Sequence, residues 1–91
     1  MQYVYIESGE IMTTLTGTKY FRGCVLREYT FDDYDNPQNA RHALRAFVRE
    51  IGLNPDDLEL IYLDNEYPSM DEIYHLCNKN YCFEFIIKTP Y

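Results

Sequence analysis

Residues 36–52, NPQNARHALRAFVREIG, constrain the fold of this chain more than any other segment. Asn36 is a favourable helix cap, and Pro37 suits the first helical position, where its missing N–H would have had no partner. Apolar residues then recur at the three- and four-residue spacing of a buried helical face, and Gly52 suits a left-handed C-cap. That face consists of Ala40, Ala43, Leu44, Phe47, Val48 and Ile51. The pattern predicts one amphipathic helix over 37–51.

The chain before this helix is typical of β-structure, because β-branched and aromatic residues form runs that end at glycines. One break lies at Ser8-Gly9 and another around Gly17. These breaks divide the segment into three predicted strands, at 2–7, 10–16 and 19–29.

The chain after the helix predicts two more strands and a second helix. LELIYL, at 58–63, is apolar on both alternating faces, which is typical of a central strand covered on both sides. Ser69-Met70-Asp71-Glu72 matches a capping box and predicts a short helix over 70–77. YCFEFIIK, at 81–88, alternates as a last strand does.

These elements together predict an α+β fold with the order β-β-β-α-β-α-β. We expect a two-layer sandwich, in which an antiparallel sheet of four or five strands carries the long helix on one face and the short helix near one end. The chain has 91 residues, of which 46% are apolar, and this suits a single domain, 1–91, with one core.

The charge of the chain excludes some partners. Its formal net charge is −7, which argues against binding nucleic acid or an anionic membrane, because such contacts depend on clustered lysine and arginine. From Glu50 to Asn78 there are eight acidic residues and no lysine or arginine. An electrostatically steered partner should therefore be basic.

Cysteine usage and hydropathy bear on the location. Cys24, Cys77 and Cys82 are odd in number and lack the spacing of a disulfide framework, so they are expected to be thiols in a reducing compartment. No signal sequence or membrane span is evident, which favours a soluble, cytoplasmic protein.

Two acidic segments, 28–35 and 63–74, also carry tyrosines, whose amphipathic rings give large contact area at a low entropic cost. We predict that they bind a partner, with carboxylates steering it and phenol rings holding it. The alternative is that both are ordinary solvated turns, since such a charge is common in small domains. The candidate partner-binding residues are Asp32, Asp33, Tyr34, Asp35, Asp64, Glu66, Tyr67, Asp71 and Glu72.

The predicted long helix carries a basic row, because Arg41, Arg45 and Arg49 are four residues apart. The row could clamp a phosphate or carboxylate. The more ordinary expectation is that these side chains are solvated or pair with the surplus acids.

No motif indicates a metal, a cofactor or catalysis. His75, Cys77 and Cys82 do not have a zinc-finger spacing, and a helix over 70–77 would separate the first two; a hairpin turning at 78–80 would instead place them on one face. Asp32, Asp33 and Asp35 lack the pattern of a calcium loop. A base-stacking surface formed by Tyr81, Phe83 and Phe85 would be surrounded by acids, so these rings are expected in the core instead.

The sequence therefore favours a small, acidic, non-enzymatic protein that covers a basic surface of a partner, such as its nucleic-acid-binding groove, by mimicking phosphates. Anti-CRISPR and anti-restriction inhibitors carried by phages and mobile elements share this composition, although no motif links the chain to them. An immunity or antitoxin protein that neutralises one toxin is the first alternative. A small metal-dependent enzyme using Asp32, Asp33 and Asp35 or the cysteines is the second.

Overall fold

The computed structural model describes residues 12–64 and 69–90. Its elements in chain order are β1 (Thr14–Phe21), β2 (Cys24–Thr30), α1 (Pro37–Glu50), the 3₁₀ turn η1 (Pro55–Asp57), β3 (Glu59–Leu63), β4 (Ser69–Cys77) and β5 (Cys82–Pro90). The α+β class, the antiparallel sheet and the long helix predicted from the sequence are confirmed.

Helix α1 begins and ends at the capping residues predicted from the sequence. The Asn36 side chain accepts a hydrogen bond from the backbone N–H of Asn39 at 2.8 Å, and Pro37 occupies the first helical position. At the other end Gly52 has a φ of 85°, a left-handed conformation that glycine adopts without strain. Ala40, Leu44 and Val48 are buried, so the predicted apolar face is the one that packs on the sheet.

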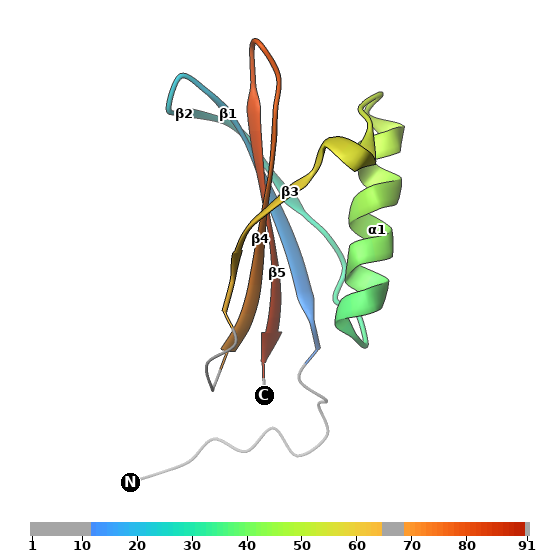
Figure 1. Cartoon of the computed structure of the whole chain (residues 1–91). Coiled ribbons are helices and arrows are strands. Elements are labelled where there is room, and N and C mark those ends of the chain that lie inside the picture. Colours follow the sequence, from blue (N-terminus) through green and yellow to red (C-terminus); the bar gives the residue numbers. More distant parts are fainter. Residues whose placement is uncertain (1–11, 65–68, 91) are drawn as a thin grey trace, which may run out of the picture.

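The five strands are all antiparallel and lie in the order β2-β1-β5-β4-β3. Helix α1 covers one face of this sheet, opposite β5 and β1 (Figure 1). The core between the two layers holds Leu15, Leu76, Phe83, Phe85 and Ile87 from the strands and Ala40, Leu44 and Val48 from the helix. The expectation that the aromatic residues of the last strand face the helix is confirmed for Phe83 and Phe85.

The predicted division of the N-terminal half was wrong where it can be compared. The predicted strand 2–7 lies outside the described residues, as do the first two residues of the strand predicted at 10–16. Gly17 does not break the chain but lies within β1, opposite Phe85 of β5. The turn comes later, at Arg22 and Gly23, which both have positive φ. Gly17 is a glycine because the Phe85 ring fills the place of a side chain: a Cβ there would lie 2.7 Å from Cδ1 of Phe85.

The predicted short helix over 70–77 was also wrong, because this segment is strand β4, paired with β5 on one side and β3 on the other. Side chains of β4 alternate between the two faces of the sheet. Leu76 and Glu72 are buried on the α1 face, and His75 is half-buried on the opposite face. Long-range pairing thus outweighs the local pattern that resembled a capping box.

The sequence predicted that the strand at 58–63 is central in the sheet, and this was wrong. Strand β3 forms one edge of the sheet. Its neighbour on one side is β4, and no described strand lies on the other. Every residue from Glu59 to Leu63 is exposed, so the apolar character of this strand does not reflect burial.

The β4–β5 hairpin turns at 78–81, where the Asn78 side chain accepts hydrogen bonds from the backbone N–H groups of Asn80 and Tyr81, both at 2.8 Å. Cys77 and Cys82 face each other beside this turn and form a disulfide, with Cα atoms 4.1 Å apart. The expectation of three thiols was therefore wrong for this pair, because the hairpin brings the two residues into register. Cys24 is a free, exposed thiol.

Among the described residues, no helix has the length and apolar character needed to cross a membrane.

Candidate functional site

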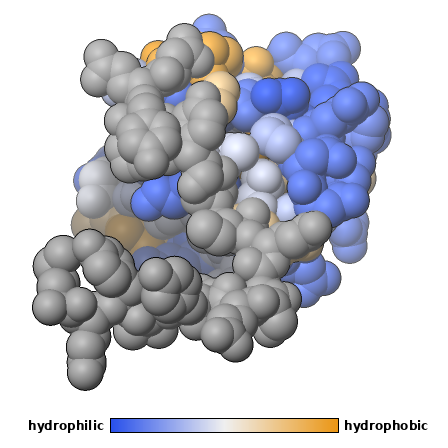
Figure 2. All heavy atoms as spheres, turned by 90° about the horizontal axis from the view of Figure 1, so that it is seen from below, coloured by the Kyte–Doolittle hydropathy of each residue, from blue (hydrophilic) through white to orange (hydrophobic). Residues whose placement is uncertain are grey.

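The two acidic segments lie at the same end of the sheet, where β2 and β3 finish and β1 and β4 begin (Figure 1). Seen from below, hydrophilic side chains gather at this end on the side where α1 lies (Figure 2). The strand order nevertheless separates the two segments, because β2 and β3 are opposite edges of the sheet. Four strand spacings of about 4.8 Å put their ends roughly 19 Å apart. The structure therefore forms two acidic groups and not one continuous patch.

The first group lies in the connection 31–36. Asp32, Asp33 and Asp35 are exposed, and Asp35 accepts a hydrogen bond from the Asn39 side chain at 2.6 Å. The backbone of Tyr34 is fixed by two hydrogen bonds to Thr13: its N–H donates to the Thr13 carbonyl at 2.7 Å, and its carbonyl accepts from the Thr13 N–H at 2.9 Å. Burial and the neighbouring Asp32 carboxylate raise the pKa of Tyr34. Its ring packs against the core and is not an available anchor.

The second group lies at the junction of β3 and β4. Asp64 donates its backbone N–H to the carbonyl of Asp71 at 2.8 Å, which fixes the end of β3 against β4. Asp71 pairs in register with Lys88 of β5, on the sheet face away from α1, and its Oδ1 is buried without a partner among the described residues. Glu66 and Tyr67, two other predicted contact residues, lie outside the described residues.

Glu72, also predicted to contact a partner, points into the protein. Its side chain is only 7% exposed and accepts two hydrogen bonds from Arg41, both at 2.9 Å, and a third from the Tyr74 hydroxyl at 2.9 Å. The hydrogen bond to Glu72 raises the pKa of Arg41, while burial and then Glu72 raise the pKa of Tyr74. Glu72 therefore joins α1 to β4, and we exclude it from the contact surface.

Arg45, one helical turn later, joins α1 to the start of β3. Its Nη2 donates to Oδ1 of Asp56 at 2.9 Å, and its Nη1 approaches the carbonyl oxygen of Pro55 at 3.4 Å. The expectation that the arginine row pairs with surplus acids is confirmed for Arg41 and Arg45. These contacts hold η1 against the helix and so determine where β3 begins.

A run of exposed apolar residues lies on the β3 edge, which we define as residues 57–64. Leu60, Ile61, Tyr62 and Leu63 are between 45% and 52% exposed, although all four are large and apolar. Asp57 and Glu59 precede them, Asp64 follows them, and no cation lies among them. An apolar strip bordered by carboxylates is the result.

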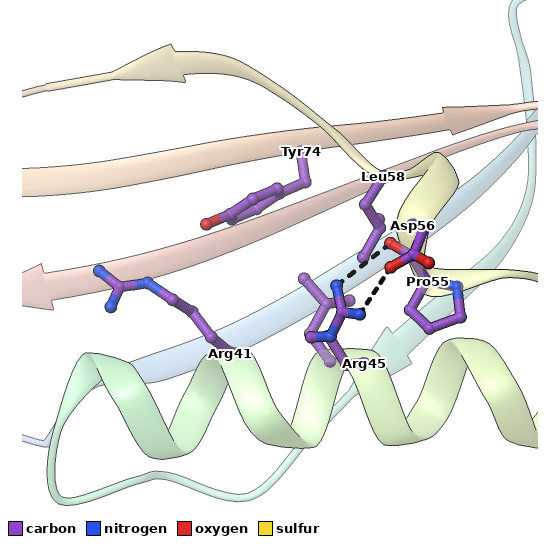
Figure 3. Close-up of a pocket in the computed structure, with 7 residues that line it drawn as sticks. Arg41, Arg45, Pro55, Asp56, Leu58 and Tyr74 are labelled. Carbon is purple, nitrogen blue, oxygen red and sulfur yellow. Dashed lines mark hydrogen bonds and ion pairs between the residues drawn. The ribbon is translucent and has the colours of Figure 1, made fainter.

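A groove lies beside this edge, between α1 and the β3–β4 pair (Figure 3). It has a volume of about 320 Å³ and is lined by Arg41, Leu44, Arg45, Pro55, Asp56, Leu58 and Tyr74. Leu44, Leu58 and Pro55 supply apolar surface. The two guanidiniums lie along the helix side of the groove, each held by the carboxylate described above.

The alternative sites considered from the sequence were the cysteines with His75 and the three aspartates Asp32, Asp33 and Asp35. The described residues contain no group of three or more histidine, cysteine or carboxylate side chains placed to hold a metal ion. His75 and Cys77 do share a sheet face, as a hairpin requires, but Cys77 is joined to Cys82 and His75 contacts Glu84 at 3.0 Å. The carboxylates of Asp32, Asp33 and Asp35 lie exposed on the connection 31–36.

Sequence reasoning found the acidic segments but missed the β3 edge and the groove. The missing information was the strand order, which decides whether an apolar run is covered or exposed. One signal was present: the run LIYL is bordered on both sides by acids, whereas buried central strands usually end in turn residues. Comparison of the chain with protein-family models, curated proteins and solved structures finds no match.

Proposed function

We propose that this protein is a non-enzymatic binding protein whose β3 edge docks on a basic surface of a partner protein and covers it. The partner surface is one that would otherwise hold nucleic acid, so the carboxylates take the place of phosphates. An inhibitor of the kind that phages and mobile elements carry, acting in the manner of an anti-CRISPR or anti-restriction protein, fits this role.

The observation that carries the proposal is the exposure of Leu60–Leu63. Natural sheets seldom leave several consecutive large apolar residues exposed on an edge strand, because such an edge recruits other chains. Selection against aggregation would remove this run unless it had a use. Tyr62, at 52% exposed, supplies the amphipathic ring that often forms the centre of an interface.

Charge indicates what kind of partner this is. Asp57 and Glu59 are exposed beside the apolar run. Residues 51–78 contain no lysine or arginine that could balance them. Complementary potentials speed the encounter of two proteins and suppress wrong partners. A basic surface is therefore the one that the β3 edge selects.

The proposal includes a cytoplasmic location, where nucleic-acid-binding partners of this kind act. The Cys77–Cys82 disulfide of the structure would be unusual in that compartment, so whether this pair is reduced in cells tests the location. Alkylation of freshly lysed cells, followed by mass spectrometry, would find reduced thiols if the location is right. A fully oxidised pair would count against it.

Affinity capture with charge variants tests the binding itself. The wild type, Asp57→Lys/Glu59→Lys and the matched control Glu28→Lys/Glu50→Lys would each be immobilised and exposed to lysate and to purified nucleases. Both double variants change the net charge equally, and all four side chains are exposed. We expect the wild type and the control to retain a basic partner that rising salt or added DNA releases, and the β3-edge variant to lose it.

Retention that is insensitive to salt, or equal retention by all three proteins, would contradict the proposal. Circular dichroism of the variants would show whether each remains folded, since surface charge changes of this kind should alter stability by less than about 1 kcal/mol.

A further inference from the structure

The backbone of β3 has hydrogen-bonding groups that no described strand uses. Asp64 bonds to Asp71 of β4 at 2.8 Å, and successive residues of an antiparallel strand direct their N–H and C=O groups to opposite sides. Leu63, its neighbour, therefore directs its N–H and C=O away from β4, toward the side of β3 where no described strand lies. A peptide strand laid along β3 would find these groups ready to pair.

The centre of β3 has a β-bulge between Leu60 and Tyr62, but it lacks the charged residues and proline that also protect edge strands. Lysine, proline and charged residues in the middle of a strand discourage pairing with another chain, and β3 has none of them between Leu60 and Leu63. The opposite edge is different, because β2 carries Arg27 and Glu28 in its middle. Both edges expose large apolar residues, Val25 and Leu26 on β2 and Leu60–Leu63 on β3, but of these two described edge strands only β3 has no charged residue in its middle.

We infer that β3 binds its partner by strand addition: an extended segment of the partner pairs with β3 as a further antiparallel strand of the sheet. This inference rests on the proposed function and specifies how the contact is made. Backbone hydrogen bonds supply affinity in such a complex, and pockets for alternate side chains supply specificity.

The groove between α1 and the β3–β4 pair suits alternate side chains of the added strand. Side chains of a strand point to either face in turn, so every second residue of the added segment is directed to the α1 side of the sheet. Leu58 of the groove precedes β3 directly, and Tyr74 is opposite Leu60 in the β3–β4 register. An apolar side chain of the partner can lie there against Leu44.

Charge favours a basic segment over a second copy of this chain. Pairing two copies along β3 would bring Asp57, Glu59 and Asp64 of both chains to one contact with no lysine or arginine in either strip to balance them, and like charges repel. Lysine or arginine on either side of an apolar centre would instead meet Asp57 and Glu59 at one end and Asp64 at the other. The occupant is therefore a partner segment with an apolar centre and basic flanks.

Selection from a random dodecapeptide library on the immobilised protein tests this inference, followed by affinity measurement with three variants. Leu63→Pro removes the outward N–H, a substitution that edge strands tolerate when the N–H faces solvent. Leu63→Ala is the matched control, because it loses the side chain but keeps the N–H. Asp57→Lys/Glu59→Lys tests charge separately.

We expect the enriched peptides to alternate apolar residues between basic ends. Leu63→Pro should bind them about tenfold or more weakly than Leu63→Ala, the loss corresponding to one or two backbone hydrogen bonds. In the wild type, bound peptide should slow hydrogen exchange of the Leu63 amide. This last measurement needs no variant and decides the matter if Leu63→Pro fails to fold.

The other outcomes separate the inference from the proposed function. Basic peptides that bind Leu63→Pro and Leu63→Ala equally, and leave the Leu63 amide unprotected, would overturn strand addition while supporting a basic partner. Peptides that are not basic, or that bind Asp57→Lys/Glu59→Lys unchanged, would overturn the proposed function. A wild-type dimer that Leu63→Pro converts to a monomer would make a second copy the occupant and overturn the inference.

Discussion

The substitution Gly17→Ala should destabilise this protein, although replacing a strand glycine with alanine is usually favourable. A Cβ at this position would lie 2.7 Å from Cδ1 and 2.8 Å from Cε1 of Phe85, closer than real Cβ contacts. The ring cannot easily retreat, because Phe85 is fully buried, with Phe47 at 5.8 Å and Phe83 at 6.0 Å between ring centroids. Either the ring or strand β1 must shift.

The magnitude follows from two opposing effects. Inserting one methyl group into a well-packed core typically costs about 1–3 kcal/mol. Alanine restricts the unfolded chain more than glycine does, which returns about 0.4–1 kcal/mol. The midpoints of these two ranges leave a net loss of about 1.3 kcal/mol in the free energy of unfolding, or about 5–10 °C in Tm for a domain of this size.

Urea denaturation of Gly17→Ala, Phe85→Leu and the double variant measures this loss and its cause. Leucine at position 85 removes the ring atoms that the new methyl group meets, so Gly17→Ala should cost less in the Phe85→Leu background. We expect a coupling free energy of about 1 kcal/mol between the two substitutions.

Two results would refute this reasoning in different ways. If Gly17→Ala stabilises the protein, the Phe85 ring does not cover position 17. If it destabilises equally in both backgrounds, the cause is backbone strain, as the prediction of a turn around Gly17 implies, and not the aromatic contact.

Three further effects should be measurable. Glu72→Gln removes the charge that receives both Arg41 bonds, so it should lower the free energy of unfolding by about 1–3 kcal/mol in urea denaturation. Burial and the hydrogen bond to Glu72 raise the pKa of Tyr74 above the ordinary tyrosine value of about 10, so the stabilisation linked to its proton is complete below about pH 10 and is lost as pH rises through the folded-state pKa. Stability measured against alkaline pH should fall less in Tyr74→Phe than in the wild type, where Tyr34, whose pKa is also raised, still contributes to the loss in both proteins. Reduction of the Cys77–Cys82 bond, which closes a short loop of sequence separation 5, should cost about 2 kcal/mol, and Cys77→Ser/Cys82→Ser should be insensitive to reductant.

The part of the fold that sequence predicts well is the part fixed by neighbouring residues. Helix α1 begins at its Asn36 cap and ends at Gly52, and both signals act within one helical turn. The segment 70–77 also has a local helix signal, yet it forms β4, because strands on both sides satisfy its backbone. Such pairing partners lie up to 21 positions away in the chain, as for Ser69 and Pro90, and no local pattern encodes them.

The candidate site shows the same division. The absence of lysine and arginine from residues 51–78 is visible in the sequence, and in the structure Asp57 and Glu59 of this segment are exposed. Whether separate acids form one surface depends on the strand order, which places the connection 31–36 and the β3 edge at opposite sides of the sheet. The inward position of Glu72 depends in turn on Arg41, 31 residues away.

The arginines of α1 therefore decide where the negative charge acts. Arg41 and Arg45 neutralise Glu72 and Asp56, and this leaves Asp57 and Glu59 as exposed carboxylates beside the apolar run of β3. Arg45→Gln would release Asp56 close to that run. The electrostatic potential at the β3 edge should become more negative, so association with a basic partner should become faster. The loss of the contact between Arg45 and η1 should lower the free energy of unfolding by up to about 1 kcal/mol. Stopped-flow association and thermal denaturation of the same variant would show opposite changes if the β3 edge binds the partner, whereas an unchanged association rate would mean that the partner binds elsewhere.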